Sequence, residues 1–154
     1  FVFMEDTGGA SQNVSFSNSM RVKNNNNQFF RNAEVVDKHR IWLDLLVPSG
    51  KVSTTLIGYV NGATNARDRL YDAYIIDNTS LGIYSKIENE NMLIQGRATP
   101  FNDLDTVALG VNISEIGVHT IAIHALDGLF EGNQTVFLED QALGVIHNSQ
   151  LSES

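Results

Sequence analysis

The chain has 154 residues, a formal net charge of −8 and hydrophobic residues at 42%, which predicts a globular protein and excludes a mostly disordered one. Its acidic surface would repel phosphate backbones, so we expect no nucleic-acid partner. Cysteine is absent, which excludes disulfides and thiolate chemistry, and no apolar run reaches the roughly 20 residues of a membrane-spanning helix.

The N-terminal region contains one clear predicted strand. The sequence does not begin with Met, and we expect it to be a mature or excised piece of a longer protein. Residues 1–12 are expected to form a flexible or linking segment. Apolar and polar residues then alternate over Asn13–Lys23, which predicts a strand with one buried face.

Two hairpins are predicted in the middle of the chain. Lys38–Val47 and Lys51–Val60 both show period-two alternation, and Pro48-Ser49-Gly50 between them is a typical turn. Leu81–Ile87 is joined to the strand after Asn91 by a tight connection, which predicts the second hairpin.

The stretch Asn91–Phe101 is the most distinctive of the predicted strands. Alternation places two sets of side chains on opposite faces, namely Met92, Ile94, Gly96 and Ala98, and then Leu93, Gln95 and Arg97. Because the second set mixes polar and apolar residues, we expect its face to be partly wet. Gly96 predicts a bulge or a close neighbour, and Pro100 predicts the end of strand pairing.

Further short strands complete an all-β pattern. They are expected at Ala73–Ile76, Thr106–Val111, Val118–Leu126, Thr135–Glu139 and Val145–His147, with residues 148–154 as a tail. Strands at this spacing favour a single domain over residues 1–154. The predicted fold is an antiparallel β-sandwich, immunoglobulin-like or jelly-roll-like.

Few residues indicate chemistry. The sequence has no phosphate-binding glycine loop and no nucleophile elbow, and each of its four histidines is expected to be structural or on the surface. Carboxylates in two Asp- and Asn-rich loops suit calcium, although solvated acidic turns are the plainer interpretation. The candidate calcium ligands are Asp68, Asp72, Asp103 and Asp105.

Aromatic and acidic residues leave two alternatives open. Trp42 and Tyr59 would stack on sugar rings if they faced outward, which defines a carbohydrate-binding or adhesive β-sandwich, although packing in the core is the simpler expectation. A glycan hydrolase would need two carboxylates in one cleft, and nothing in the sequence selects such a pair from Asp127, Glu139 and Asp140.

Six ordered segments carry a resemblance to a known family. They are His39–Leu45, Leu56–Asn65, Ile83–Ser85, Leu93–Phe101, Asp105–Gly110 and Val136–Asp140. In this order they resemble the C-terminal region of secreted and surface proteins of Bacteroidetes, particularly flavobacteria. That region is a type C sorting domain of the type nine secretion system.

The resemblance implies a non-catalytic module without a cofactor, secreted or displayed on the cell surface. Such a module delivers an upstream passenger protein, for example an adhesin, through the outer membrane. Its expected partners are components of the secretion system in that membrane. The expected recognition loops are Gly62–Asn65, with Gly62, Ala63, Thr64 and Asn65, and Gly96–Phe101, with Gly96, Arg97, Pro100 and Phe101.

Two points qualify this resemblance. Instead of contacting a partner, Arg97 could have a structural role inside the domain, in which it pairs with Asp103 or Asp105 and holds the loop in place. The family also continues into a final pair of strands, whereas this sequence stops at Ser154, so we expect the final strands to be missing and a sheet edge to be exposed.

Overall fold

The computed structural model describes residues 37–75, 81–132 and 134–148, which belong to one compact unit spanning residues 35–154. These residues form strands joined by turns and one short 3-10 helix, which confirms the all-β prediction. The strand predicted at Asn13–Lys23 and the tail after Asn148 lie outside the described residues.

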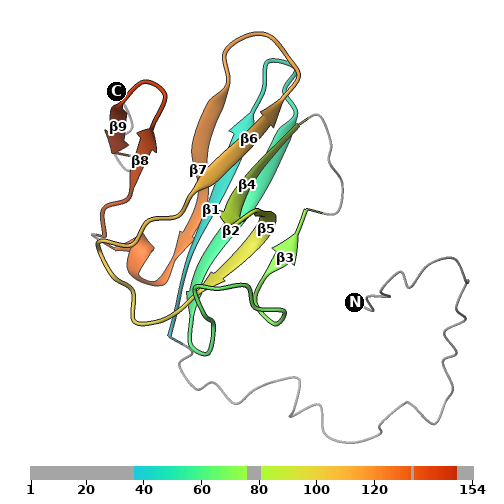
Figure 1. The fold of residues 1–154 in the computed structure, drawn as a ribbon. Coiled ribbons are helices and arrows are strands. Elements are labelled where there is room, and N and C mark those ends of the chain that lie inside the picture. The colour runs from blue at the N-terminus through green and yellow to red at the C-terminus, as the bar shows by residue number, and fades with distance from the viewer. Residues whose placement is uncertain (1–36, 76–80, 133, 149–154) are drawn as a thin grey trace, which may run out of the picture. The chain divides into compact units, whose positions relative to one another are not determined.

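Nine strands lie in the described part of the chain (Figure 1). The main sheet contains β1 (Lys38–Leu46), β2 (Val52–Val60), β3 (Ala73–Tyr74), β4 (Leu81–Ile87), β5 (Glu90–Arg97), β6 (Leu109–Ile113) and β7 (Thr120–Asp127). The 3-10 helix η3 (Gly128–Glu131) follows, and β8 (Phe137–Asp140) and β9 (Val145–Asn148) form a separate two-stranded sheet. β6 begins at Leu109 rather than at Thr106, and β5 ends at Arg97 rather than at the predicted stop near Pro100.

Both predicted hairpins are confirmed. β1 and β2 pair antiparallel from Lys38↔Val60 to Leu46↔Val52, and the turn at Pro48–Gly50 closes them. β4 and β5 pair antiparallel up to Ile87↔Glu90, with Glu88 at a positive φ of 54° in the turn. Positive φ in such a short turn matches the twist of the two strands.

The main sheet is mixed rather than wholly antiparallel, because β2 and β5 run parallel. β4 pairs with the first half of β5, at Glu90–Met92, and β2 pairs with its second half, at Ile94–Arg97. The resulting order is β6-β4-β5-β2-β1-β7, with β3 also paired to β5. β5 therefore joins the two halves of the sheet, and the division into two packed layers stays a prediction.

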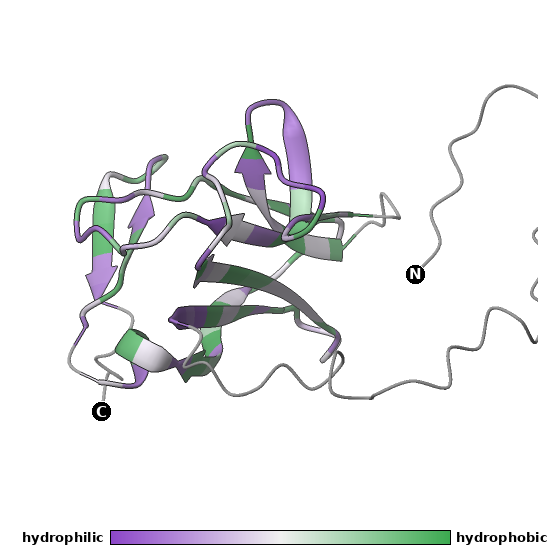
Figure 2. Cartoon of the chain, turned by 90° about the horizontal axis from the view of Figure 1, so that it is seen from below, coloured by the Kyte–Doolittle hydropathy of each residue, from purple (hydrophilic) through white to green (hydrophobic). Residues whose placement is uncertain are grey.

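Apolar side chains from both halves of the sheet form the core. Figure 2 shows apolar and hydrophilic residues alternating along the strands. The buried cluster contains Ile41, Leu43, Leu45, Val47, Ile57, Tyr59, Ile83 and Phe130. The core thus takes residues from β1 and β2, and β7 and η3 add Ile121, Ile123, Leu126 and Phe130 to it.

The exposure expected along β5 is confirmed only in part. Leu93 and Ile94 are both exposed, at 38% and 37%, so the regular alternation breaks between them. Gln95 and Arg97, expected on a partly wet face, are 1% and 8% exposed. The break occurs where the pairing of β5 changes from β4 to β2.

Candidate functional site

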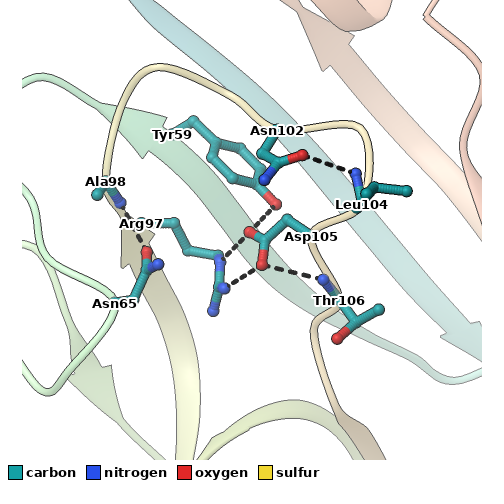
Figure 3. Close-up of polar contacts among 8 residues, drawn as sticks. All are labelled: Tyr59, Asn65, Arg97, Ala98, Asn102, Leu104, Asp105 and Thr106. Carbon is teal, nitrogen blue, oxygen red and sulfur yellow. Dashed lines mark hydrogen bonds and ion pairs between the residues drawn. The ribbon is translucent and has the colours of Figure 1, made fainter.

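The two predicted recognition loops meet at the C-terminal half of β5, and their polar contacts form the candidate site (Figure 3). The backbone N–H of Ala98 donates to Asn65 Oδ1 at 3.0 Å. The backbone N–H of Gly96 donates to Asp72 Oδ1 at 2.8 Å. These two bonds attach the Gly62–Asn65 loop and the residues after it to β5.

The loop that supplies these acceptors is held by its own turns. Ala63 N–H donates to Val60 O at 3.0 Å, in a turn with Gly62 at a φ of 92°. Asp68 O accepts from Asp72 N–H at 2.8 Å, and Asp72 Oδ2 accepts from Asp68 N–H at 2.5 Å. The Asp72 carboxylate therefore closes its own loop with one oxygen and binds β5 with the other.

Gly96 lets this loop approach the strand closely. A Cβ built on Gly96 would lie 2.4 Å from the Cβ of Tyr71 and 3.4 Å from the Cβ of Ala63. No side chain fits at that distance, so the predicted close neighbour of Gly96 is confirmed as Tyr71. Alternate residues of a strand direct their N–H groups to the same edge. Asp72 and Asn65 therefore occupy the edge of β5 where a further strand would otherwise pair.

Arg97 lies at the centre of the second set of contacts. Its Nε donates to Asp105 Oδ2 at 2.7 Å and its Nη2 donates to Asp105 Oδ1 at 2.5 Å. A two-point contact of this kind is the strong form of a guanidinium–carboxylate pair. The internal role considered for Arg97 is thus confirmed, with Asp105 rather than Asp103 as the partner.

Local structure places Asp105 and Tyr59 against Arg97. Asn102 begins a turn in which Leu104 N–H donates to its Oδ1 at 3.0 Å and Asp105 N–H donates to its O at 2.9 Å. Tyr59 is the register partner of Arg97 across the parallel β2–β5 pair, and its hydroxyl donates to Asp105 Oδ2 at 2.8 Å.

These contacts move the pKa values of the two acids of the network further from neutral pH. Burial alone would raise the pKa of Asp105, but hydrogen bonds from Arg97 and Tyr59 and the Arg97 charge outweigh burial and hold that pKa below its ordinary value of 3.8. Burial, followed by the bond to Asp105, raises the pKa of Tyr59. Tyr59 therefore stays a hydroxyl donor and Asp105 a carboxylate acceptor at neutral pH.

The predicted recognition residues divide by exposure. Gly62, Thr64, Asn65 and Pro100 are exposed, whereas Ala63, Gly96 and Arg97 are buried. Phe101 packs against the core, with ring centroids 4.9 Å from Tyr59 and 5.2 Å from Phe130. Of the predicted recognition residues, only the four exposed ones can contact a partner directly. The remaining four lie beneath the surface and support the loops.

The acids considered for calcium have other partners in the structure. Asp72 and Asp105 accept the bonds given above, and Asp68 Oδ1 accepts from Leu70 N–H at 3.0 Å. Asp103 lies exposed in the Asn102–Asp105 turn. Across residues 37–75, 81–132 and 134–148, no three His, Asp or Glu side chains gather in a way that could hold a metal ion.

Two aromatic side chains outside the core, Trp42 and Tyr74, each have an arginine over the ring. The Arg40 guanidinium lies 4.7 Å from the centroid of the Trp42 ring, and Arg67 lies 4.6 Å from that of Tyr74. Arg40 is also bound to Asp127, and Arg67 lies 3.6 Å from Glu90. Arg67 thus pairs with a nearby acid, and one face of the Trp42 ring lies against the Arg40 guanidinium.

Sequence reasoning missed the hydroxyl of Tyr59 and the contact of Tyr71 with Gly96. Tyr59 was considered only as a core or sugar-stacking aromatic. Its polar role depends on the parallel register with Arg97, which pairs strands separated by more than thirty residues in sequence. No local pattern in the sequence indicates this register.

Comparison with known protein families matches residues 1–153 to a domain of unknown function, DUF8693. The chain belongs to this family. The match covers the candidate site and the sheet around it. Neither the curated proteins nor the solved structures contain a match to the chain. Within the described residues, no helix has the length and apolar character needed to cross a membrane.

Proposed function

We propose that this DUF8693 domain is a non-catalytic module of a secreted bacterial surface protein. It serves type nine secretion and the cell-surface display of an upstream passenger. The observation that carries the proposal is the internal use of the motif residues. The polar side chains of the site form hydrogen bonds within the domain, namely those of Asn65, Asp72, Arg97 and Asp105. These side chains therefore stabilise the fold.

The six ordered segments that resemble type C sorting domains support the same proposal. All six contribute residues to strands, namely β1, β2, β4, β5, β6 and β8, and the two loop segments meet at Asn65 and Ala98. A delivery module needs a self-supporting fold and an accessible surface rather than a reaction centre. The exposed residues Gly62, Thr64 and Pro100 provide such a surface beside a rigid strand.

A secretion assay tests the proposal directly. The 154-residue chain is fused behind a fluorescent passenger with a signal peptide and expressed in a flavobacterium with a type nine secretion system. We expect protease-accessible passenger at the surface, and none in a strain without the secretion system. Retention of the passenger in both strains would contradict the proposal.

A charge placed on the exposed loop separates docking from folding in that assay. Thr64→Lys changes an exposed side chain next to Asn65, and we expect it to reduce surface passenger with little change in stability. Thr120→Lys, at an exposed position of β7, is the matched control and should leave export unchanged. Equal export by both variants would remove the Gly62–Asn65 loop from the recognition surface.

A further inference from the structure

We propose that β6 is a self-association edge, which pairs antiparallel with β6 of a second copy of this chain about a two-fold axis at Val111. This inference goes beyond the proposed delivery function and does not depend on it. It follows from how the described edges of the main sheet are protected, and from the sequence of β6.

Two of the edges are closed to an incoming strand. On β5, Asp72 and Asn65 occupy the N–H groups of Gly96 and Ala98. On β7, the register with β1 shifts between Trp42↔Ala125 and Leu43↔Ile123, which leaves His124 as an extra residue in a bulge. Capping side chains and bulges are both devices that prevent strand addition.

β6 has neither device. It stands at the end of the sheet order, with β4 as its neighbour, and its pairing with β4 is regular from Leu81↔Ile113 to Ser85↔Leu109. No charged residue and no proline occur from Thr106 to Ser114. On a chain with a net charge of −8, this neutral strand is where a second copy meets the least repulsion.

The β6 sequence also complements itself. Antiparallel pairing centred on Val111 places Leu109 opposite Ile113 of the second copy, and Gly110 opposite Asn112. Large apolar residues thus meet each other on one face and small or polar residues on the other. A two-fold interface requires this self-complementarity of a single surface.

Apolar surface at this edge is available to be covered. Val111 is 41% exposed and Ile113 is 39% exposed, although their register partners on β4 include Ile83, which is fully buried. Leu109, on the same face, packs against the core. A second β6 would extend that apolar face and cover Val111 and Ile113. Because β6 has only five residues, we expect a weaker dimer than the interfaces that bury about 1,200 Å² or more.

Sedimentation equilibrium over a range of protein concentrations tests the proposal with matched variants. Val111→Lys places two like charges opposite each other at the axis, and we expect it to weaken dimerisation at least about tenfold. Val52→Lys is the control, because Val52 is 52% exposed but lies on β2, inside the sheet. Both variants change the net charge equally, so only the position differs.

A mixing experiment decides whether the two copies meet at Val111. We expect Val111→Lys and Val111→Glu each to be monomeric alone and to form a heterodimer when mixed, and urea unfolding verifies that each is folded. If the wild-type chain were monomeric at every concentration, the proposal would be overturned. The β6 edge would then be available only to a strand of another protein. Equal disruption by Val52→Lys, or no heterodimer on mixing, would also overturn it.

Discussion

At the scale of single residues, the ion pair between Arg97 and Asp105 should dominate the local stability. The Arg97 side chain is 10% exposed and that of Asp105 is 17% exposed. Removing one partner of such a pair leaves a charge that water reaches poorly. We expect Asp105→Asn to lower the free energy of unfolding by about 2–3 kcal/mol, measured by urea denaturation.

A neighbouring acid provides the control for this substitution. Asp103 lies in the same turn and is exposed, and no ion pair joins it to another described residue. Asp103→Asn should change the free energy of unfolding by less than about 0.5 kcal/mol. If the two variants were equally stable, the contact of Arg97 with Asp105 would contribute little to the fold.

The same carboxylate predicts a dependence of stability on pH. The pKa of Asp105 lies below its ordinary value of 3.8 in the folded chain. A lowered pKa contributes stability above the unfolded value, and this contribution is lost as the pH falls through the folded value. The difference in unfolding free energy between the wild type and Asp105→Asn should thus be constant near neutral pH and shrink below pH 3.8. A constant difference throughout acidification would show that its origin is not ionic.

At the scale of elements, the closed edge of β5 depends on the missing side chain of Gly96. We expect Gly96→Ala to lower the free energy of unfolding by about 1–3 kcal/mol, because the new methyl group meets the Cβ of Tyr71. The control is Gly82→Ala on β4, where a Cβ meets nothing within 4 Å. Thermal unfolding of both variants tests the contact, and a stable Gly96→Ala protein would mean that the loop moves away at little cost.

The hairpins show how far sequence reasoning reaches at this scale. β1 and β2 follow from alternation of residues such as Ile41 and Leu43 around the Pro48–Gly50 turn, because both signals are local. The parallel pairing of β2 with β5 has no local signal. Gln95 and Arg97 are buried although their polar character predicted contact with water, and of the three side chains predicted on that face only Leu93 is exposed.

The candidate site was predictable to a similar extent. The sequence placed Arg97 near an acid of the Asn102–Asp105 turn, since the two lie close along the chain. It did not show that Asn65 and Asp72 would bind the backbone of β5. That contact joins a loop to a strand more than twenty residues later, and only the three-dimensional approach of Tyr71 to Gly96 makes it possible.

At the scale of the whole molecule, the main sheet should depend on β7 and not on the last hairpin. β7 pairs along β1 and adds Ile121 and Ile123 to the core, whereas β8 and β9 pair only with each other. We expect a chain of residues 1–119 to lose cooperative unfolding. A chain of residues 1–136 should keep it, as measured by circular dichroism in urea. Loss of cooperativity in both would show that the β8–β9 hairpin supports the sheet.

The pairing of β1 with β7 also fixes when the sheet can be completed during synthesis. β1 ends at Leu46 and β7 ends at Asp127, so a ribosome adding about 5–20 residues per second separates the two strands by roughly 4–16 s. Throughout that interval β1 has one edge without its partner. A newly made chain therefore passes through a period of seconds in which this edge of β1 is open to a chaperone.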